Sequence, residues 1–184
     1  MLPQPPMARI PYPPTPPEDS AALLRKLPDL NIFKMLSWSP PALDGFVRMG
    51  SGLLYKGCLD PVLREIVIVR VGHLCGSEYE VRQHEHTLRA LGAHPDVVAA
   101  IPAGADAVTS ADDSLHAATG RALELADLMV SGQECAEVAQ ALRDALDERA
   151  LVELTVTIGY YLMVSRVLTT LDVDIEDEDA FLNL

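Results

Sequence analysis

Basic residues are scarce in this sequence. Its 184 residues include 14 Lys and Arg against 27 Asp and Glu, so the formal net charge is -13 and the sequence pI is near 4.6. Nucleic-acid phosphates and anionic membrane surfaces both favour a basic face, so we expect neither as a partner. An anionic substrate would need a local cationic pocket.

Cysteine is also rare, with Cys58, Cys75 and Cys135 alone in the chain. An odd number without regular spacing does not describe a secreted disulfide framework, so we expect reduced thiols in a cytoplasm. The N-terminus lacks the apolar region of a signal peptide. No apolar run reaches the roughly 18 residues of a membrane span. The sequence therefore predicts a cytoplasmic protein.

Apolar residues make up 49% of the chain, which suits one domain with a packed core. Eight of the fourteen prolines lie in residues 1–17, which excludes a helix there. We predict three regions: a proline-rich arm (1–17), a helical domain (18–171) and an acidic tail (172–184). The arm is either a loose tail or a strap that lies across a neighbouring subunit.

The domain is predicted to be all-α. The run 65–71 is rich in β-branched residues and favours a strand by propensity, but Asp60-Pro61 is a typical helix start. A helix that is apolar on all sides is a buried helix, and we interpret the run in that way. We expect residues 102–113 to be an acidic loop. Helices are predicted at 18–27, 31–38, 39–55, 60–75, 77–91, 95–101, 114–131, 134–145 and 147–171.

Glu65 is the first candidate for chemistry, because its helical neighbours are apolar. A charged carboxylate on such a stripe is costly to bury, so it must be paired or its pKa must rise. Carboxylates with a raised pKa are suited to general acid–base catalysis near neutral pH. The alternative is a structural ion pair with Arg64, Arg70 or Arg82.

Glu80 and His84 lie four residues apart and therefore share one helix face. A carboxylate can fix the tautomer of an imidazole and raise its basicity. Gly76 allows two helices to meet closely, so Glu65 is expected to face Glu80 and His84. Three further residues are expected to line the same space: His73, Ser77 and Tyr79.

This pattern resembles the carboxymuconolactone decarboxylase family, which includes the alkylhydroperoxidase D-like proteins. The family frame is a glutamate, then a histidine nineteen residues later, and Glu65 and His84 fit it. The decarboxylase branch reads Gly-x-Glu-x-Glu-x-x-x-His before that histidine, and Gly76, Glu78, Glu80 and His84 match it. The resemblance covers roughly residues 40–100 and, more loosely, 145–171.

The resemblance implies an all-α alkylhydroperoxidase D-like domain with a core helical hairpin. It also implies a homo-oligomer, with dimer, trimer and hexamer all open. A small-molecule substrate is expected, without a cofactor. We expect no metal either, because the histidines and carboxylates of the segment form no dense ligand motif.

The sequence departs from the peroxidase branch of the family. That branch has Cys-x-x-Cys-x-x-x-His, and the matching positions are Ser77 and Glu80. Neither can form a disulfide or act as a thiolate. A thiol-dependent peroxidase that uses Cys75 stays an alternative, although a small buried cysteine is the plainer interpretation.

The leading hypothesis is a cofactor-independent lyase or isomerase that acts on a small carboxylated or lactone-like molecule. In it His84 moves the proton, and Glu65 and Glu80 tune or assist it. A non-catalytic oligomeric binding protein is a further alternative, because a partial site does not prove activity. Arg70 or Arg82 is expected to hold a substrate carboxylate by paired hydrogen bonds. Tyr79 and Ser77 are expected to donate to a developing enolate.

Overall fold

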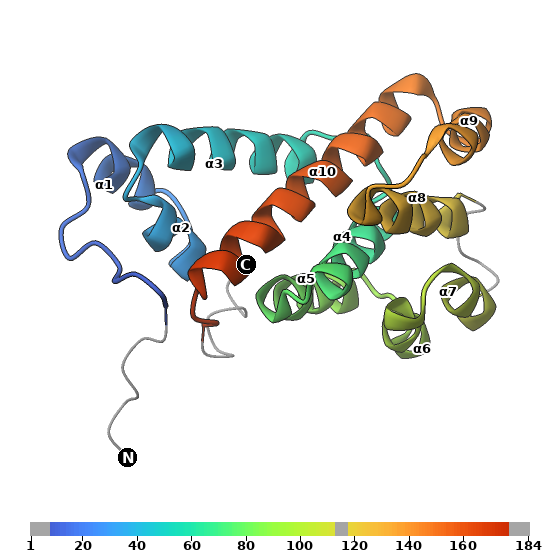
Figure 1. The fold of residues 1–184 in the computed structure, drawn as a ribbon, viewed down its shortest axis with the longest axis horizontal. Helices are drawn as coiled ribbons and strands as arrows, with labels where there is room; N and C mark the ends of the chain where they lie inside the picture. The colour runs from blue at the N-terminus through green and yellow to red at the C-terminus, as the bar shows by residue number, and fades with distance from the viewer. Residues whose placement is uncertain (1–7, 113–117, 177–184) are drawn as a thin grey trace, which may run out of the picture.

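The structure, a computed structural model, describes residues 8–112 and 118–176. Across these ranges the chain forms ten α-helices and one 3-10 turn, without a strand, which confirms the all-α prediction (Figure 1). The outer parts of the predicted arm (1–7) and tail (177–184) lie outside the described residues. The elements are α1 (Glu18–Leu24), α2 (Asn31–Leu36), α3 (Pro40–Tyr55), α4 (Pro61–Cys75), α5 (Glu78–Ala90), α6 (Pro95–Ala100), η1 (Ile101–Ala103), α7 (Ala105–Ala111), α8 (Thr119–Ser131), α9 (Ala136–Ala145) and α10 (Glu148–Leu171).

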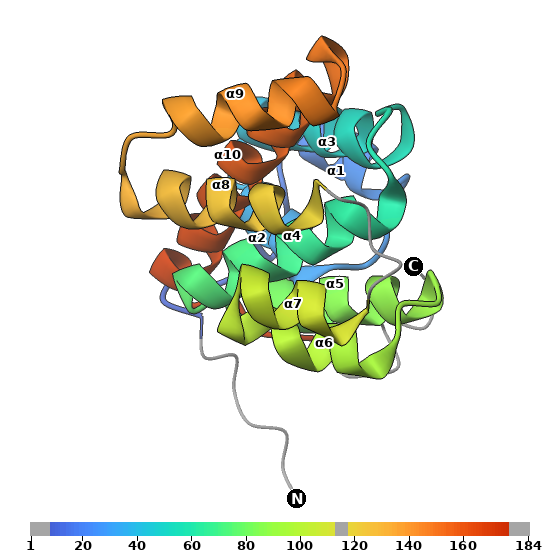
Figure 2. The same cartoon turned by 90° about the vertical axis from the view of Figure 1, so that its right-hand side faces the viewer.

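Helix α4 is the centre of the fold. The Asp60 side chain accepts a hydrogen bond from the Leu63 amide at 2.9 Å, which caps the first turn as the sequence predicts. Residues 66–69 and Val71 have no exposed surface. Figure 2 shows α4 between α5 and α8, and α10 packs against it as well. The β-branched run is therefore a buried helix, because surrounding helices cover every side of it.

Helices α4 and α5 form a tight hairpin. Gly76 ends α4 with a φ of 65°, a left-handed conformation that favours glycine. One turn earlier, a Cβ added at Gly72 would lie 3.0 Å from Val81 Cγ2 and 3.3 Å from the Val81 amide. The two helices can therefore approach closely only because position 72 carries no side chain.

Arg70 fastens α4 to α8 and to the segment after α6. Its guanidinium donates to the Asp127 carboxylate at 2.7 and 2.9 Å and to the carbonyls of Ile101 and Pro102 at 3.1 and 2.7 Å. A bidentate arginine–carboxylate pair holds a fixed geometry. This side chain is therefore a structural clamp in the described structure.

The prediction of a loop at 102–113 was wrong in part. Residues 101–103 form η1, and Ala105–Ala111 form α7. Gly104, at a φ of 99°, separates the two. The apolar pattern of α7 is weak because Val108 is its one fully buried residue. The predicted start of the next helix, at 114, lies outside the described residues.

Helix α10 is the longest element and crosses the molecule against α4 (Figure 1). Among the described residues it is the one helix long and apolar enough to span a membrane, and 44% of its most apolar window is buried inside the fold. The core helix of a soluble protein can have the same length and apolar composition, so the finding is weak evidence of a membrane span. The cellular location stays a prediction.

The two ends of the described chain lie together. The Arg9 amide donates to the Leu171 carbonyl at 2.8 Å, and the Tyr12 hydroxyl donates to the Asp174 carboxylate at 2.9 Å. The inner part of the proline-rich arm therefore lies against its own chain.

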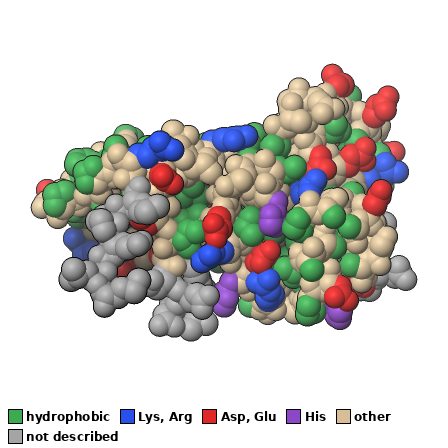
Figure 3. Space-filling model, turned by 60° about the horizontal axis from the view of Figure 1, so that its bottom comes forward, with side chains coloured by type: hydrophobic (Ala, Val, Ile, Leu, Met, Phe, Trp, Pro, Cys, Tyr) green, Lys and Arg blue, Asp and Glu red, His purple; other side chains and the backbone are tan. Residues whose placement is uncertain are grey.

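Many cationic side chains are paired locally. Four arginines pair with a carboxylate one helical turn away: Arg48–Asp44, Arg82–Glu78, Arg89–Glu85 and Arg149–Glu153. On the face shown in Figure 3, Lys and Arg side chains lie singly among acidic and apolar ones. These local pairs neutralise four of the positive charges within single helices.

The α4–α5 contact predicts an asymmetry between two glycines. Gly72→Val should lower the free energy of unfolding by about 1–3 kcal/mol, because the added carbons force the helices apart. The same exchange at Gly159, where a Cβ meets nothing within 4 Å, should be close to neutral. Urea unfolding of both variants and the parent measures this. Equal effects at the two positions would show that the close approach is not a constraint.

Candidate functional site

Glu65 lies at the bottom of the site and has no exposed surface. Arg64, the preceding residue of α4, donates to Glu65 Oε1 from Nε at 3.0 Å, and its Nη2 lies 2.9 Å from the same oxygen. Arg64 also donates to the Leu54 carbonyl at 3.0 Å, which fixes the guanidinium. The ion pair that the sequence allowed is therefore made with Arg64.

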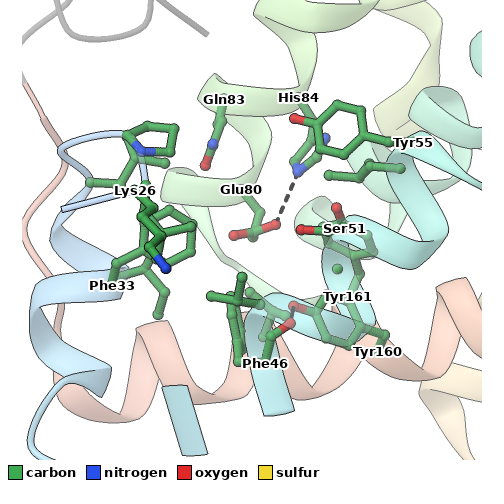
Figure 4. Close-up of a pocket in the computed structure, with 18 residues that line it drawn as sticks. Lys26, Phe33, Phe46, Ser51, Tyr55, Glu80, Gln83, His84, Tyr160 and Tyr161 are labelled. Atoms are coloured by element: carbon green, nitrogen blue, oxygen red, sulfur yellow. Dashed lines mark hydrogen bonds and ion pairs between the residues drawn. The ribbon is translucent and has the colours of Figure 1, made fainter. Parts of the chain in front are cut away.

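Helix α5 supplies Glu80 and His84 on its buried face. His84 Nδ1 lies 2.5 Å from Glu65 Oε2, and His84 Nε2 lies 3.5 Å from Glu80 Oε2. Figure 4 shows the second of these contacts, with the Glu80 carboxylate pointing into a cavity. The three residues predicted to face one another therefore converge, in the order Glu65, His84, Glu80.

The two carboxylates have opposite environments. Burial acts to raise the pKa of Glu65, but the charges and hydrogen bonds of His84 and Arg64 outweigh it, and the net pKa is lowered. For Glu80, burial dominates, the carboxylates of Glu65 and Glu176 add to it, and the pKa rises to about 7 despite the nearby imidazole. Glu65 is therefore ionised at neutral pH while Glu80 is poised to exchange a proton.

His84 takes its charge state from the same contacts. Burial acts to lower its pKa, but the Glu65 charge and hydrogen bond, together with the Glu80 charge, raise the net pKa above the ordinary value. Because Glu65 binds Nδ1, the Nε2 edge faces Glu80. The pair Glu80–His84 can hold or release a proton near neutral pH.

A cavity of about 300 Å³ lies in front of this pair. Its walls come from the segment between α1 and α2, and from α2, α3, α5 and α10. The Tyr161 ring stacks edge-on against His84, with ring centroids 4.8 Å apart. Phe46 and Tyr160 lie 5.3 Å apart by the same measure. A small cavity with aromatic walls and a few convergent polar groups is typical of a small-molecule site.

The structure does not bring the predicted arginines to this cavity. Arg70 is the clamp to Asp127 described above. Arg82 donates to Glu78 at 2.6 Å on the exposed side of α5. Neither lines the cavity. Spacing along the chain was a poor guide here, because both side chains leave their helices on faces turned away from His84.

Tyr79, Ser77 and His73 also lie outside the cavity, contrary to the expectation of one shared space. The Tyr79 hydroxyl donates to Glu176 Oε1 at 2.6 Å. Ser77 and Tyr79 line a separate hollow of about 410 Å³ beside the C-terminal end of α10. His73 Nε2 lies 3.8 Å from Glu85 Oε1, and burial lowers the pKa of His73.

Cys75 is 8% exposed, is packed in the core and does not line the cavity. Burial raises the pKa of its thiol, so the thiol is protonated at neutral pH. The three cysteines are free in the described structure. The residue predicted as an alternative redox centre therefore stands apart from the acid–base pair.

Sequence reasoning missed most of the cavity wall. Lys26, Ser51, Phe46, Tyr160 and Tyr161 all line it. The one available signal was the pair of tyrosines within an otherwise aliphatic helix. The others lie 30 or more residues from His84 in sequence, and no local motif connects them to it.

The described residues contain no group of three or more His, Cys, Asp or Glu side chains that could hold a metal ion. Three potential donors do converge, but they contact one another: His84 contacts both Glu65 and Glu80. This arrangement suits proton transfer.

Comparison with known proteins gives a family match over part of the chain. Residues 40–124 match the model of the carboxymuconolactone decarboxylase family, which confirms the resemblance predicted from the sequence. No curated protein matches the chain.

Solved structures confirm the fold. An alkylhydroperoxidase AhpD core, an uncharacterised peroxidase-related protein from Ralstonia eutropha JMP134, has a TM-score of 0.76 at 21% identity and covers 96% of each chain. A peroxidase-related protein from Silicibacter sp. TM1040 has a TM-score of 0.74 at 19% identity, over 95% of this chain and 94% of that one. A protein of unknown function from Agrobacterium tumefaciens has a TM-score of 0.64 at 17% identity, over 78% of this chain and 96% of that one. At these identities the likeness is one of fold.

The raised pKa of Glu80 predicts a pH-dependent stability. Because the folded pKa of about 7 exceeds the ordinary 4.5, Glu80 contributes most stability below pH 4.5 and loses it as pH rises through 7. Glu80→Gln should therefore match the parent near pH 4.5 and exceed its free energy of unfolding at pH 8, by about 3 kcal/mol at most. Urea unfolding at the two pH values measures this.

The control for this experiment is Glu78→Gln, on the exposed side of the same helix. It should leave the difference between the two pH values unchanged. If the Glu80 variant loses as much stability with rising pH as the parent does, the carboxyl is not held protonated by burial.

Proposed function

We propose that this chain, whose residues 40–124 match the model of the carboxymuconolactone decarboxylase family, is a cofactor-independent lyase or isomerase. It acts by acid–base chemistry on a small carboxylated or lactone-like molecule. One observation carries the proposal. Glu65 contacts His84, His84 contacts Glu80, and the last two side chains line a cavity of about 300 Å³.

His84 is the residue that moves the proton in this proposal. Glu65 fixes the imidazole through Nδ1 and stabilises its charged form. Glu80, with a pKa of about 7, lies opposite Nε2 and can supply or accept a proton there. Catalysis by a positioned acid–base pair is most efficient when its pKa lies near the working pH.

In the lyase reaction, the bond from the reacting carbon to a carboxylate breaks. Its electron pair passes into an enolate as CO2 leaves. The proton shared by His84 and Glu80 then protonates the carbon, and solvent restores that proton. In an isomerisation the same pair removes a proton from one carbon and returns it to another.

Two cavity hydroxyls can stabilise the enolate oxygen, those of Ser51 and Tyr161. Burial keeps the pKa of Tyr161 well above its ordinary value, so the phenol remains a hydrogen-bond donor. Donors placed where charge develops are a main source of catalysis. In this proposal they take the role expected of Ser77 and Tyr79 from the sequence.

Loss of the imidazole should remove the activity. His84→Ala is expected to lower kcat/KM on a panel of lactones and β-keto acids by about 10²- to 10⁴-fold. Glu80→Gln should lower kcat and remove one limb of the pH–rate profile near neutral pH. Product formation and CO2 release measure both effects.

His86→Ala is the matched control, because His86 lies two residues along α5 and does not line the cavity. It should retain the parent's turnover. Unchanged turnover in His84→Ala would remove the proton-transfer role.

A thiol-dependent peroxidase that uses Cys75 is the alternative reaction, and two solved structures of the same fold carry peroxidase-related names. The buried, protonated thiol outside the cavity gives it little support here. Peroxide consumption with a dithiol donor, lost in Cys75→Ser, would favour it. Ligand-induced thermal stabilisation without turnover of any substrate would instead indicate the non-catalytic binding protein.

Self-association is a separate proposal. The family resemblance implies a homo-oligomer, and α10 exposes Val152, Val156 and Met163, which a second copy could cover. Light scattering coupled to size-exclusion chromatography gives the mass in solution directly.

A further inference from the structure

The cavity contains one cationic side chain among the described residues, and it is not an arginine that the sequence pointed to. Arg70 and Arg82 are both paired elsewhere. Of the residues that line the cavity, Lys26 alone carries a permanent positive charge. The cation that faces the cavity therefore comes from the N-terminal part of the chain.

Lys26 is placed by the turn that ends α1. Its amide donates to the Leu23 carbonyl at 2.9 Å, and Leu27, Pro28 and Leu30 of the same segment also line the cavity. Figure 4 shows Lys26 beside Phe33, on the side of the cavity opposite His84. The ammonium group and the imidazole thus stand at two ends of one space.

Among residues 8–112 and 118–176, the side chain of Lys26 makes no ion pair or hydrogen bond. Seven of the other thirteen Lys and Arg side chains pair with carboxylates, and Lys26 differs from all thirteen in that it lines the cavity. No ion pair joins Lys26 to Glu80 or to another described carboxylate, so the ammonium group is available to an anion in the cavity.

We propose that Lys26 is the specificity-determining residue of this site and binds the carboxylate of the substrate. The substrate class is a small molecule with an apolar or aromatic body and a carboxylate that is remote from the reacting carbon. Its body lies between the aromatic walls, its anionic group meets Lys26, and its far end reaches Glu80 and His84. The consequence for turnover rests on the proposed lyase or isomerase function, but the binding preference does not.

The preference can be measured without turnover. Phenylacetate and phenylacetamide have the same body and differ in charge, so isothermal titration calorimetry on the full chain compares them directly. The parent should bind phenylacetate about fivefold more tightly, the upper range for an exposed ion pair. Lys26→Gln should bind the two probes equally, and Lys26→Arg should restore the preference.

Arg25→Gln is the matched control, since it removes the same charge from the adjacent exposed residue, which does not line the cavity. It should keep the full preference. Equal binding of the probes by the parent, no binding of either probe, or loss of the preference in Arg25→Gln as well would overturn the proposal. Failure of the lyase assay alone would leave this binding result standing.

Discussion

The structure depends on how the negative charge of one buried carboxylate is compensated. Glu65 has no exposed surface, and an ionised group in that position is tolerated only when paired and hydrogen-bonded. Arg64 provides one partner from the same helix and His84 provides the other from α5. Removing either leaves an uncompensated charge, which typically costs about 3–5 kcal/mol. The same contacts therefore tie the hairpin together and orient the imidazole.

This compensation also separates the roles of the two carboxylates. Glu65 has Arg64 and the imidazole of His84 on its two oxygens and a lowered pKa, whereas Glu80 has the imidazole at 3.5 Å and a pKa of about 7. Titratable groups whose environments push their pKa values apart are characteristic of acid–base sites. The fold alone does not select the reaction, because similar folds host different chemistries. The cavity in front of His84 is what connects the pair to a small molecule.

Much of the fold could be predicted from local signals. Asp60-Pro61 and Asp147 mark helix starts, and both carboxylates cap them. The buried α4 was predicted because its cap outweighed its strand propensity. The segment at 102–113 was not predicted as a helix, because α7 buries one side chain fully and so has almost no periodic pattern. Short helices of this kind are held by neighbours that the sequence does not identify.

The sequence by itself indicated that Glu65, Glu80 and His84 meet. Helical spacing placed Glu80 and His84 on one face, a glycine turn allowed two helices to approach, and the family resemblance indicated that Glu65 faces His84. Only the tertiary structure decided what surrounds them. It turned Arg70 towards Asp127, kept Tyr79 with Glu176, and brought Lys26 and Tyr161 to the cavity from distant parts of the chain. Those placements follow from packing among non-adjacent helices, and such packing leaves no local pattern in the sequence.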